Sequence, residues 1–555
     1  MIDYRKDVDA LRGYAVLAVV FYHFNIPYFQ GGFLGVDIFF VISGYLITSI
    51  IFLELKSNNF SFINFYERRI RRIIPILFFV LFTTTIIQSE LLIYDEKINF
   101  YKALLSIIFF ISNLWFAKSG TYFEPEISQS HLLHTWSLSI EEQFYLIFPL
   151  LLFFFYKKRV FFILLTIFVV SLLLANNGGV LKYSYPFYDE FKFIKTPGNN
   201  FYLMPTRLWE LLAGSMIAIF NIKFRKNYKF NFKNKIKNLL NIIGYFIIFI
   251  SFIIFSEKIP HPSIITIIPI LGISIILFLD ISKNKSETII EKIFTNKYII
   301  KVGLISYSLY LWHLPILYFY HDYFGPEKLN FLEILFLIAL SFTISIFSYN
   351  FIEKFFRKKF ILKKGQTLIF FFIITLILGS FAFYKINFYN FKKDYSKDII
   401  RIIDEKIYFK DKFFVKCLSD PRKYISPKDS CIIGDTKKIK YAFLGDSHMG
   451  ILSKELNINL KEKNIGGHLL SYNGCLPSNE LKILDQERYK CTNYYNEVLE
   501  FLKNDNRIKK VILFYRWDLY YNGTRFDNKL GGKEKGEDHF AINVNSNNHI
   551  NEFNI

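Results

Sequence analysis

Long apolar segments recur along most of this chain and constrain its fold more than any other feature. A helix needs about 20 consecutive apolar residues for each membrane crossing. The hydrophobic fraction of 52% exceeds what a soluble domain buries, which argues against a soluble enzyme. We therefore predict eleven crossings, near residues 8–25, 32–53, 73–93, 136–156, 160–177, 203–221, 238–256, 262–281, 299–320, 331–353 and 367–385.

The basic residues set the expected orientation of these crossings. The chain has a formal net charge of +21, and its lysines and arginines lie in clusters between alternate apolar segments. That pattern is typical of cytoplasmic membrane loops rather than of a nucleic-acid-binding surface, so no nucleic-acid partner is expected. It predicts a cytoplasmic amino terminus and places the part after about residue 386 on the outer face. A crossing by the apolar stretch 100–116 would upset this alternation, so we expect that stretch to be interfacial or re-entrant.

The four cysteines all lie in the part predicted to be outside. Disulfides persist in oxidising compartments, so this placement agrees with the predicted orientation. Sequence order favours the pairs Cys417–Cys431 and Cys475–Cys491, although three connectivities are possible.

Two polar residues share the first apolar segment. Arg12 and His23 are eleven residues apart, which on a helix returns them to within about 20° of the same face, roughly 16 Å apart. Histidine is suited to proton transfer near neutral pH, and arginine to pairing with phosphate or carboxylate. The alternative is an arginine that reaches the inner headgroups and a histidine that hydrogen-bonds a neighbouring helix.

Further charged residues lie at or near membrane depth, where each one needs a structural or functional reason. Asp37 would orient His23 if the first two helices pack as a hairpin; otherwise it forms a buried pair with a lysine or a backbone group. Arg207 and Glu210 are spaced for an intrahelical ion pair. At the inner edge of the third span lies a run of arginines, which is either a membrane anchor or a clamp on a phosphorylated donor: Arg68, Arg69, Arg71 and Arg72.

A polar run opens the fourth predicted span. His131 and His134 have the spacing of metal ligands, but no further convincing ligand follows, so no metal is expected. Glu141 and Glu142 are adjacent and point to different faces of a helix, so at least one of them should be inward and paired.

These segments, taken in order, resemble the membrane acyltransferase family 3 of the O-antigen acetylase type. The resemblance covers roughly residues 5–357, with one departure at Phe355, where the family usually has proline. Members have about ten helices and move acyl groups, usually acetyl from cytoplasmic acetyl-CoA, onto surface polysaccharides, lipopolysaccharide or peptidoglycan. The motifs are Arg12 with His23, Gly35 to Leu46, Arg68 to Pro75, Trp136 to Tyr145, Arg207 to Gly214, Ile305 to Pro315, and Ile352 to Lys354.

The resemblance implies that the protein lies in the inner membrane of a bacterium. It also implies a role for each of several polar residues. The family's functional pair, arginine and histidine eleven positions apart, maps onto Arg12 and His23. His23 is then the general base on an acceptor hydroxyl of a cell-surface or lipid-linked glycan, and Asp37 or Glu142 tunes it. Acyl-CoA is a co-substrate rather than a bound cofactor, and the oligomeric state stays open. The donor would be held by Arg12 with one or more of Arg68, Arg69 and Arg72.

The outer part begins with an apolar run, residues 438–444, followed by Gly445-Asp446-Ser447-His448. A serine on a tight turn after a strand is a nucleophile position. This run resembles the first block of SGNH hydrolases, Gly474 resembles the second, which contributes to the oxyanion hole, and residues 511–517 would form a third strand.

The final Asp-x-x-His of such hydrolases has no counterpart here. Asp538 and His539 are adjacent, and His549 has no aspartate three residues before it. Ser447 therefore lacks an evident base. Either the chain is truncated, or this domain binds glycan or orients acceptors without a complete triad, and we predict an incomplete domain, truncated or without independent activity.

The predicted fold is an α-helical polytopic membrane domain of about ten helices plus one linking helix, followed by a partial α/β SGNH-like domain. The boundaries are 1–357 for the acyltransferase domain, 358–386 for the linking helix, 387–437 for a linker and 438–555 for the SGNH-like domain. Two other functions remain open. One is a transporter or flippase with an outer binding domain, although no internal repeat supports it. The other is an esterase acting through Ser447 alone.

Overall fold

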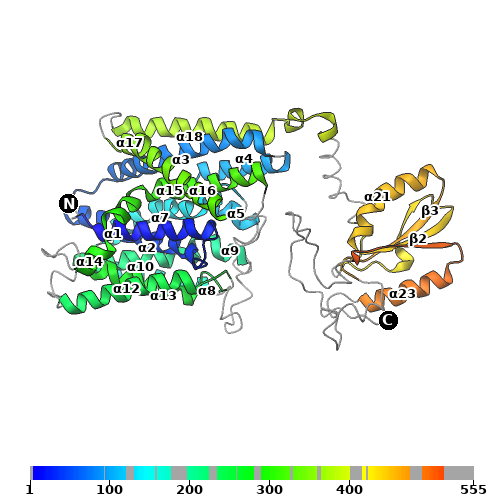
Figure 1. The fold of residues 1–555 in the computed structure, drawn as a ribbon, viewed down its shortest axis with the longest axis horizontal. Helices are drawn as coiled ribbons and strands as arrows, with labels where there is room; N and C mark the ends of the chain where they lie inside the picture. The colour runs from blue at the N-terminus through cyan, green and yellow to red at the C-terminus, as the bar shows by residue number, and fades with distance from the viewer. Residues whose placement is uncertain are drawn as a thin grey trace. The chain divides into compact units, whose positions relative to one another are not determined.

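The chain divides into two units, Met1–Asn390 and Phe391–Ile555, which are considered separately (Figure 1). The structure is a computed structural model. It describes residues 4–92, 94–119, 130–156, 159–176, 197–223, 234–257, 259–279, 289–325, 329–358, 364–400, 416–420, 423–475 and 491–517.

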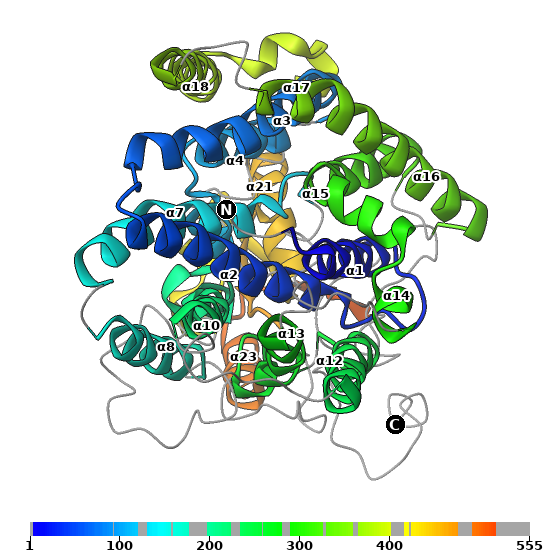
Figure 2. The same ribbon diagram turned by 90° about the vertical axis from the view of Figure 1, so that its left-hand side faces the viewer.

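The described part of the first unit is helical. Figure 2 shows α1 and α2 within the bundle and α18 at one edge of it. The elements are α1 (Lys6–His23), the short η1 (Gly32–Leu34), α2 (Gly35–Lys56), α3 (Phe62–Leu91), α4 (Tyr94–Ile108), α5 (Ser112–Ser119), α7 (Thr135–Phe155), α8 (Val160–Asn176), α9 (Pro197–Tyr202), α10 (Met204–Lys223), α12 (Asn234–Ile254), η3 (Ile264–Thr266), α13 (Ile267–Leu279), α14 (Ile289–Phe294), α15 (Lys297–Phe324), α16 (Phe331–Ser348), the π-helical turn η5 (Tyr349–Glu353), α17 (Lys354–Arg357) and α18 (Lys364–Asn387).

The helices lie where the apolar segments predicted them. Among the described residues, eight helices are long and apolar enough to cross a membrane, and α8 and α13 are shorter apolar helices. The remaining predicted crossing, 8–25, corresponds to α1, whose first two turns carry both acidic and basic residues. Each predicted crossing thus overlaps one helix, and the chain is a multi-pass membrane protein.

The apolar stretch 100–116 is broken rather than continuous. Helix α4 ends at Ile108, α5 begins at Ser112, and Phe110 between them has a positive φ of 54°. The Gln143 side chain of α7 donates from Nε2 to the Phe110 carbonyl at 3.0 Å. Non-helical backbone at membrane depth needs such protein partners, so the break agrees with a stretch that is not a simple crossing.

Glycines bring two helix pairs into backbone contact. A Cβ on Gly44 of α2 would lie 1.8 Å from the Leu211 carbonyl oxygen, and one on Gly214 of α10 would lie 1.9 Å from that of Val41. Likewise, a Cβ on Gly303 of α15 would lie 1.7 Å from the Asp9 oxygen of α1. Small residues allow this close packing of membrane helices. They fix α2 against α10 and α1 against α15.

The second unit contains a four-stranded sheet in the order β1-β3-β2-β4. Strand β2 runs parallel to β3 and β4, and β1 is antiparallel to β3. Apolar side chains pack α21 and α23 against the sheet in two separate clusters. The elements are β1 (Cys431–Gly434), β2 (Ile439–Gly445), α21 (Ser447–Glu462), β3 (Gly466–Ser471), α23 (Cys491–Asn504) and β4 (Lys510–Phe514).

This unit confirms three local predictions. The apolar run before Ser447 is strand β2, residues 511–517 include most of β4, and the disulfides are Cys417–Cys431 and Cys475–Cys491. Strand β1 lies inside the segment 387–437 that was predicted to be a linker, so the sheet begins before residue 438.

Candidate functional site

The four arginines predicted to bind a donor line one cavity, which we call the arginine cavity. Arg12 comes from α1, and Arg68, Arg69 and Arg72 come from the second and third turns of α3. Arg5, Lys56 and Arg357 also line this cavity, against two acidic residues, Asp9 and Glu54. The cavity therefore carries a clear excess of positive charge.

Salt bridges hold two of these arginines in place. Arg12 Nη1 lies 3.2 Å from Asp9 Oδ1, and Arg68 Nη2 lies 2.9 Å from Glu54 Oε1. Arg71, on the same helix, faces elsewhere: it pairs with Glu67 at 2.9 Å and donates to Thr367 at 2.5 Å. The structure thus separates Arg71, which ties α3 to α18, from the three cavity arginines of α3.

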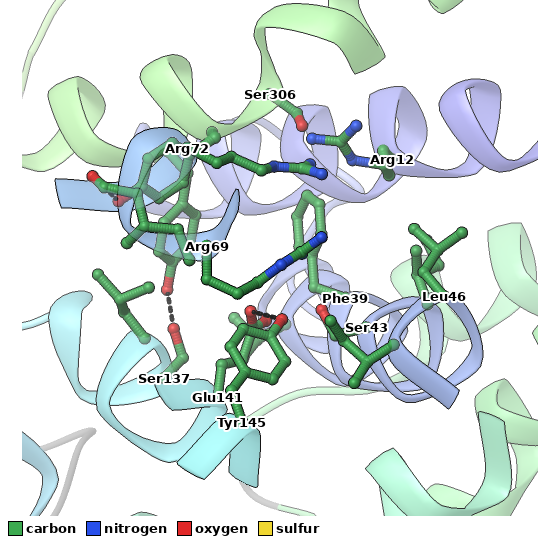
Figure 3. A pocket seen from close by; sticks show the side chains of 17 residues that line it. Arg12, Phe39, Ser43, Leu46, Arg69, Arg72, Ser137, Glu141, Tyr145 and Ser306 are labelled. Carbon is green, nitrogen blue, oxygen red and sulfur yellow. Dashed lines mark hydrogen bonds between the residues drawn. The ribbon is translucent and has the colours of Figure 1, made fainter. Parts of the chain in front are cut away.

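A second cavity adjoins the first, and we call it the central cavity. Arg12, Leu46, Arg69 and Arg72 line both cavities, so the two are contiguous. Figure 3 shows the guanidinium groups of Arg12, Arg69 and Arg72 directed toward the same space. Hydroxyl and carboxylate groups form part of the remaining lining: Ser43, Ser137, Glu141, Tyr145, Ser306, Tyr307 and Tyr310. Apolar side chains form the other part: Val36, Phe39, Ile42, Ile47, Ile73 and Leu138.

The adjacent carboxylates of α7 have different surroundings, as their spacing predicted. Glu141 faces the central cavity and accepts a hydrogen bond from the Tyr145 hydroxyl at 2.9 Å. Glu142 lines a neighbouring, mostly apolar groove together with Arg69 and Tyr145. Among the described residues no hydrogen bond or ion pair joins Glu142 to His23, so a role for Glu142 in tuning His23 stays a prediction.

His23 ends α1 and belongs to a group of three imidazoles. Its Nδ1 lies 3.2 Å from His313 Nε2 of α15, and the ring centroids of His313 and His134 are 5.4 Å apart. The ring of Tyr310, which lines the central cavity, lies 5.5 Å from that of His313. The imidazole group therefore adjoins the cavity through Tyr310, whereas His23 itself is not among the residues that line it.

Sequence reasoning missed His313 as a site residue. His313 lies within the family-like motif Ile305 to Pro315, and the resemblance implies no role for it. The signal was present, because an imidazole at the centre of an apolar helix needs a partner as much as His23 does. His313 has no solvent-exposed surface in the structure.

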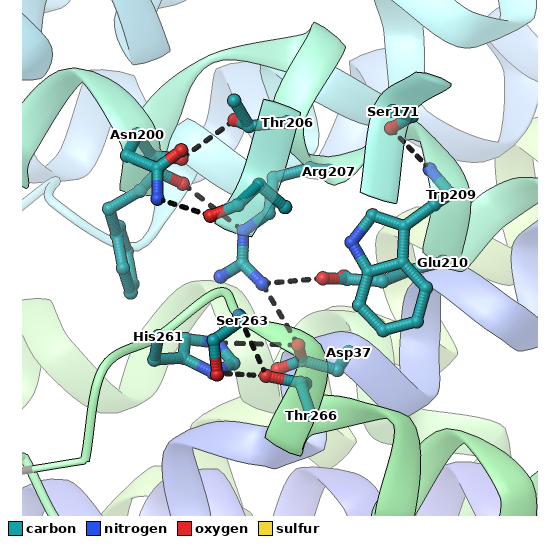
Figure 4. A network of polar contacts seen from close by, with 12 residues as sticks. Asp37, Ser171, Asn200, Thr206, Arg207, Trp209, Glu210, His261, Ser263 and Thr266 are labelled. Carbon is teal, nitrogen blue, oxygen red and sulfur yellow. Dashed lines mark hydrogen bonds and ion pairs between the residues drawn. The ribbon is translucent and has the colours of Figure 1, made fainter. Parts of the chain in front are cut away.

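The expectation that Asp37 orients His23 is wrong. Asp37 Oδ1 lies 2.9 Å from Arg207 Nη1 and 3.3 Å from His261 Nε2 (Figure 4). The reason is helix packing: Asp37 lies in the first turn of α2, on the side held against α10 rather than against α1. The alternative of a buried pair holds, with arginine as the partner. Arg207 also forms the predicted ion pair with Glu210, at 2.7 Å.

Ser447 lies at the carboxyl end of β2, as the first residue of α21. Asp446 caps this helix by accepting from His448 N at 2.8 Å, and its other oxygen accepts from Arg516 N, just after β4, at 3.1 Å. Gly474 follows β3 with a φ of +72°, which glycine adopts readily. Asp538, His539 and His549 lie outside the described residues.

Comparisons with known proteins agree with this architecture. The model of the acyltransferase domain family Acyl_transf_3 matches residues 5–350, and that of the SGNH domain fused to such domains matches residues 416–552. No solved structure matches the chain.

Several curated relatives from Staphylococcus aureus are similar to this chain. A protein of strain MSSA476 that is provisionally named an O-acetyltransferase is 32% identical over 364 residues. The O-acetyltransferase OatA of strain NCTC 8325 is 30% identical over 366 residues. Each match covers 64% of this chain and 58% of the relative, so the chain spans little more than half the length of these relatives. By the match over residues 5–350, the chain belongs to the Acyl_transf_3 family of membrane acyltransferases and carries, in its second unit, an SGNH domain of the kind fused to them.

Proposed function

We propose that this chain transfers an acetyl group from cytoplasmic acetyl-CoA to a hydroxyl of a cell-surface or lipid-linked glycan in the bacterial envelope. The observation that carries the proposal is the pair of contiguous cavities, one rich in arginine and the other presenting several hydroxyl groups among apolar side chains. The names of the relatives, O-acetyltransferases, support acetyl as the group that is moved.

The donor would bind in the arginine cavity. Coenzyme A carries several phosphate groups, and arginine pairs with phosphate through two parallel hydrogen bonds. Arg12, Arg69 and Arg72 lie where the two cavities meet, so a donor held there would direct its thioester toward the central cavity. This arrangement requires the arginine cavity to face the cytoplasm, as the basic loops predict.

His23 would act on the acceptor. In the proposed step, an imidazole nitrogen of His23 takes the proton of the glycan hydroxyl, and the oxygen attacks the carbonyl carbon of the acetyl group. The carbon–sulfur bond breaks, and coenzyme A leaves as a thiolate that is then protonated. Arg12 and His23 share one helix eleven residues apart, roughly 16 Å, so donor and acceptor sites at its two ends would lie toward opposite membrane faces.

The SGNH domain would lie on the outer side of the membrane and would act on the acceptor glycan. Ser447 has the position of a nucleophile, after a central strand and at a helix start. His23 would perform the essential proton transfer, and Ser447 would be a candidate for a later step on the outer face.

The test is the O-acetyl content of envelope glycans from cells that express the wild-type chain, His23→Ala or Ser447→Ala. His321→Ala serves as a matched control, because His321 lies on α15 and bonds the Gly325 carbonyl rather than His23. We expect His23→Ala to abolish acetylation at equal membrane levels and His321→Ala to retain it. Acetylation that survives His23→Ala in the inserted protein contradicts the proposed mechanism.

A further inference from the structure

We infer that His313 is a positioning residue that holds His23 in the tautomer protonated on Nδ1, so that Nε2 of His23 is the nitrogen that accepts the proton. The inference rests on the proposed function only where it states that Nε2 of His23 takes the proton of the glycan hydroxyl. The tautomer itself follows from the hydrogen bonds around the two rings.

The first constraint comes from His313. Its Nδ1 lies 2.6 Å from the carbonyl oxygen of Tyr310. A carbonyl oxygen only accepts hydrogen bonds, so Nδ1 of His313 carries a hydrogen and donates it. In a neutral imidazole the other nitrogen then holds a lone pair. Nε2 of His313 is therefore an acceptor, and it faces Nδ1 of His23 at 3.2 Å.

The second constraint comes from His23. Its Nδ1 lies 3.0 Å from the carbonyl oxygen of Val19, one helical turn earlier. This oxygen also only accepts, so Nδ1 of His23 meets two acceptors, the Val19 carbonyl and His313 Nε2. Both require a hydrogen on Nδ1 of His23. The two independent contacts agree, and the lone pair of neutral His23 lies on Nε2.

The opposite arrangement conflicts with the geometry. A hydrogen on Nε2 of His313 would direct it at Nδ1 of His23, and the lone pair of that nitrogen would then face the Val19 oxygen as well. Such a His313 would also carry a positive charge while fully buried, next to the imidazoles of His23 and His134. Burial of an unpaired charge is costly, which favours the neutral ring.

Helix packing fixes the separation of the two rings. A Cβ on Gly303 of α15 would meet the Asp9 oxygen of α1, and one on Gly13 of α1 would lie 2.5 Å from the Ile299 oxygen of α15. Next to His313, Trp312 donates from Nε1 to Ser348 Oγ of α16 at 2.9 Å. His313 is thus held on a helix whose backbone touches the helix of His23. Residues that orient a functional histidine through its second nitrogen act in the same way at metal sites.

The experiment measures the tautomer directly. The full chain, labelled with ¹⁵N-histidine and reconstituted in lipid, is examined by NMR near pH 8, with the His23 signals assigned by their loss in His23→Gln. Wild type should show Nδ1 of His23 protonated and Nε2 unprotonated. His313→Leu should convert a measurable share of His23 to the other tautomer. His313→Gln should restore the wild-type spectrum, because its amide oxygen can accept from Nδ1.

Activity provides the second readout. In membrane vesicles given radiolabelled acetyl-CoA and the host's own envelope glycan, His313→Leu should lower kcat about 10- to 100-fold, the loss typical of removing a partner that orients a functional histidine at a metal site. The KM for acetyl-CoA should stay the same, since His313 does not line the arginine cavity. His321→Leu, a matched change on the same helix, should leave spectrum and kcat unchanged.

Two results would overturn the inference: a wild-type His23 protonated on Nε2, or an unchanged His23 spectrum and kcat in His313→Leu. The wild-type spectrum decides the first point even if a variant fails to fold. A wild type with the expected tautomer but no acetyl transfer would instead contradict the proposed function.

Discussion

Arg207 donates from a single nitrogen, Nη1, to two buried carboxylates, Asp37 at 2.9 Å and Glu210 at 2.7 Å. None of these three side chains exposes more than 1% of its surface. The guanidinium also donates from Nε to the Phe201 carbonyl at 3.1 Å, and His261 approaches Asp37 (Figure 4). This network joins α2, α10 and the segment before α13, so its ion pairs hold these parts of the bundle together.

Loss of the positive charge of Arg207 should strongly destabilise the membrane unit. Arg207→Met leaves Asp37 and Glu210 buried without their cation, and breaking a buried pair in this way costs about 3–5 kcal/mol. We expect a lower thermal unfolding temperature in detergent and a smaller folded fraction. Arg159→Met, at an exposed position in a turn, is the matched control and should unfold like wild type. Equal unfolding temperatures for the two variants would show that the network is not needed for folding.

The contact between α1 and α15 predicts that a steric change at Gly303, ten residues before His313 on α15, lowers activity. Gly303→Leu places a side chain where a Cβ alone would lie 1.7 Å from the Asp9 oxygen. The helices must separate, which moves His313 away from His23. We expect acetylation of envelope glycan to fall at least tenfold in protein that still reaches the membrane. Gly365→Leu, at a glycine whose Cβ position has no atom of the described residues within 4 Å, should keep full activity.

Helix positions were predictable from the sequence because each depends on the length of one apolar segment. The Arg207–Glu210 pair and both disulfides were also predictable, since their partners are near in sequence. The partners of Asp37 and His23 were not, because they lie 170 and 290 residues away and are chosen by the packing of helix pairs. Nothing in a single segment indicates that α2 presents Asp37 to α10 and that α1 presents His23 to α15.

The arginines of α3 should differ in their roles: Arg69 and Arg72 should bind the donor, whereas Arg71 should stabilise the fold. Arg69→Ala and Arg72→Ala each remove a cation from the junction of the two cavities. A hydrogen bond to a charged group contributes about 1.5–3 kcal/mol, so each variant should raise the KM for acetyl-CoA about 10- to 100-fold. Inside-out membrane vesicles, which expose the cytoplasmic face to the donor, provide the assay.

Arg71→Ala is the control on the same helix. Arg71 pairs with Glu67 and Thr367 instead of lining either cavity, so its removal should lower the unfolding temperature and leave the KM unchanged. A KM that rises equally in all three variants would indicate a general effect of charge on α3 rather than donor binding by Arg69 and Arg72.

The second unit should lose stability in mild acid because of His468. This histidine lies buried on β3, with Nδ1 2.9 Å from Ser430 Oγ and Nε2 3.6 Å from Asp505 Oδ2. Burial lowers the pKa of His468, and the neighbouring Asp505 only partly opposes this shift. Hydrogen bonds from Arg507 lower the pKa of Asp505, so this carboxyl remains ionised to lower pH than usual.

The sign of the effect follows from proton binding. An unfolded histidine has a pKa of about 6.5. Between that value and the lower pKa of folded His468, the unfolded chain binds more protons than the folded one. The stability contributed by neutral His468 is therefore complete above about pH 6.5 and is lost as the pH falls through the folded pKa. Asp505 adds a similar loss only below about pH 4, the range in which an unfolded aspartate is protonated.

Hydrogen exchange of strand β3 in the full chain, corrected for the intrinsic pH dependence of exchange, tests this assignment. Protection of residues 466–471 should fall between pH 7.5 and 5.5 in wild type. It should stay level in His468→Gln, which has no group that titrates in this range. His448→Gln changes a histidine of the same unit whose side chain is 39% exposed, and it should keep the wild-type pH dependence. Wild-type protection that is constant or rises toward pH 5.5 would show that another group controls the acid stability of the sheet.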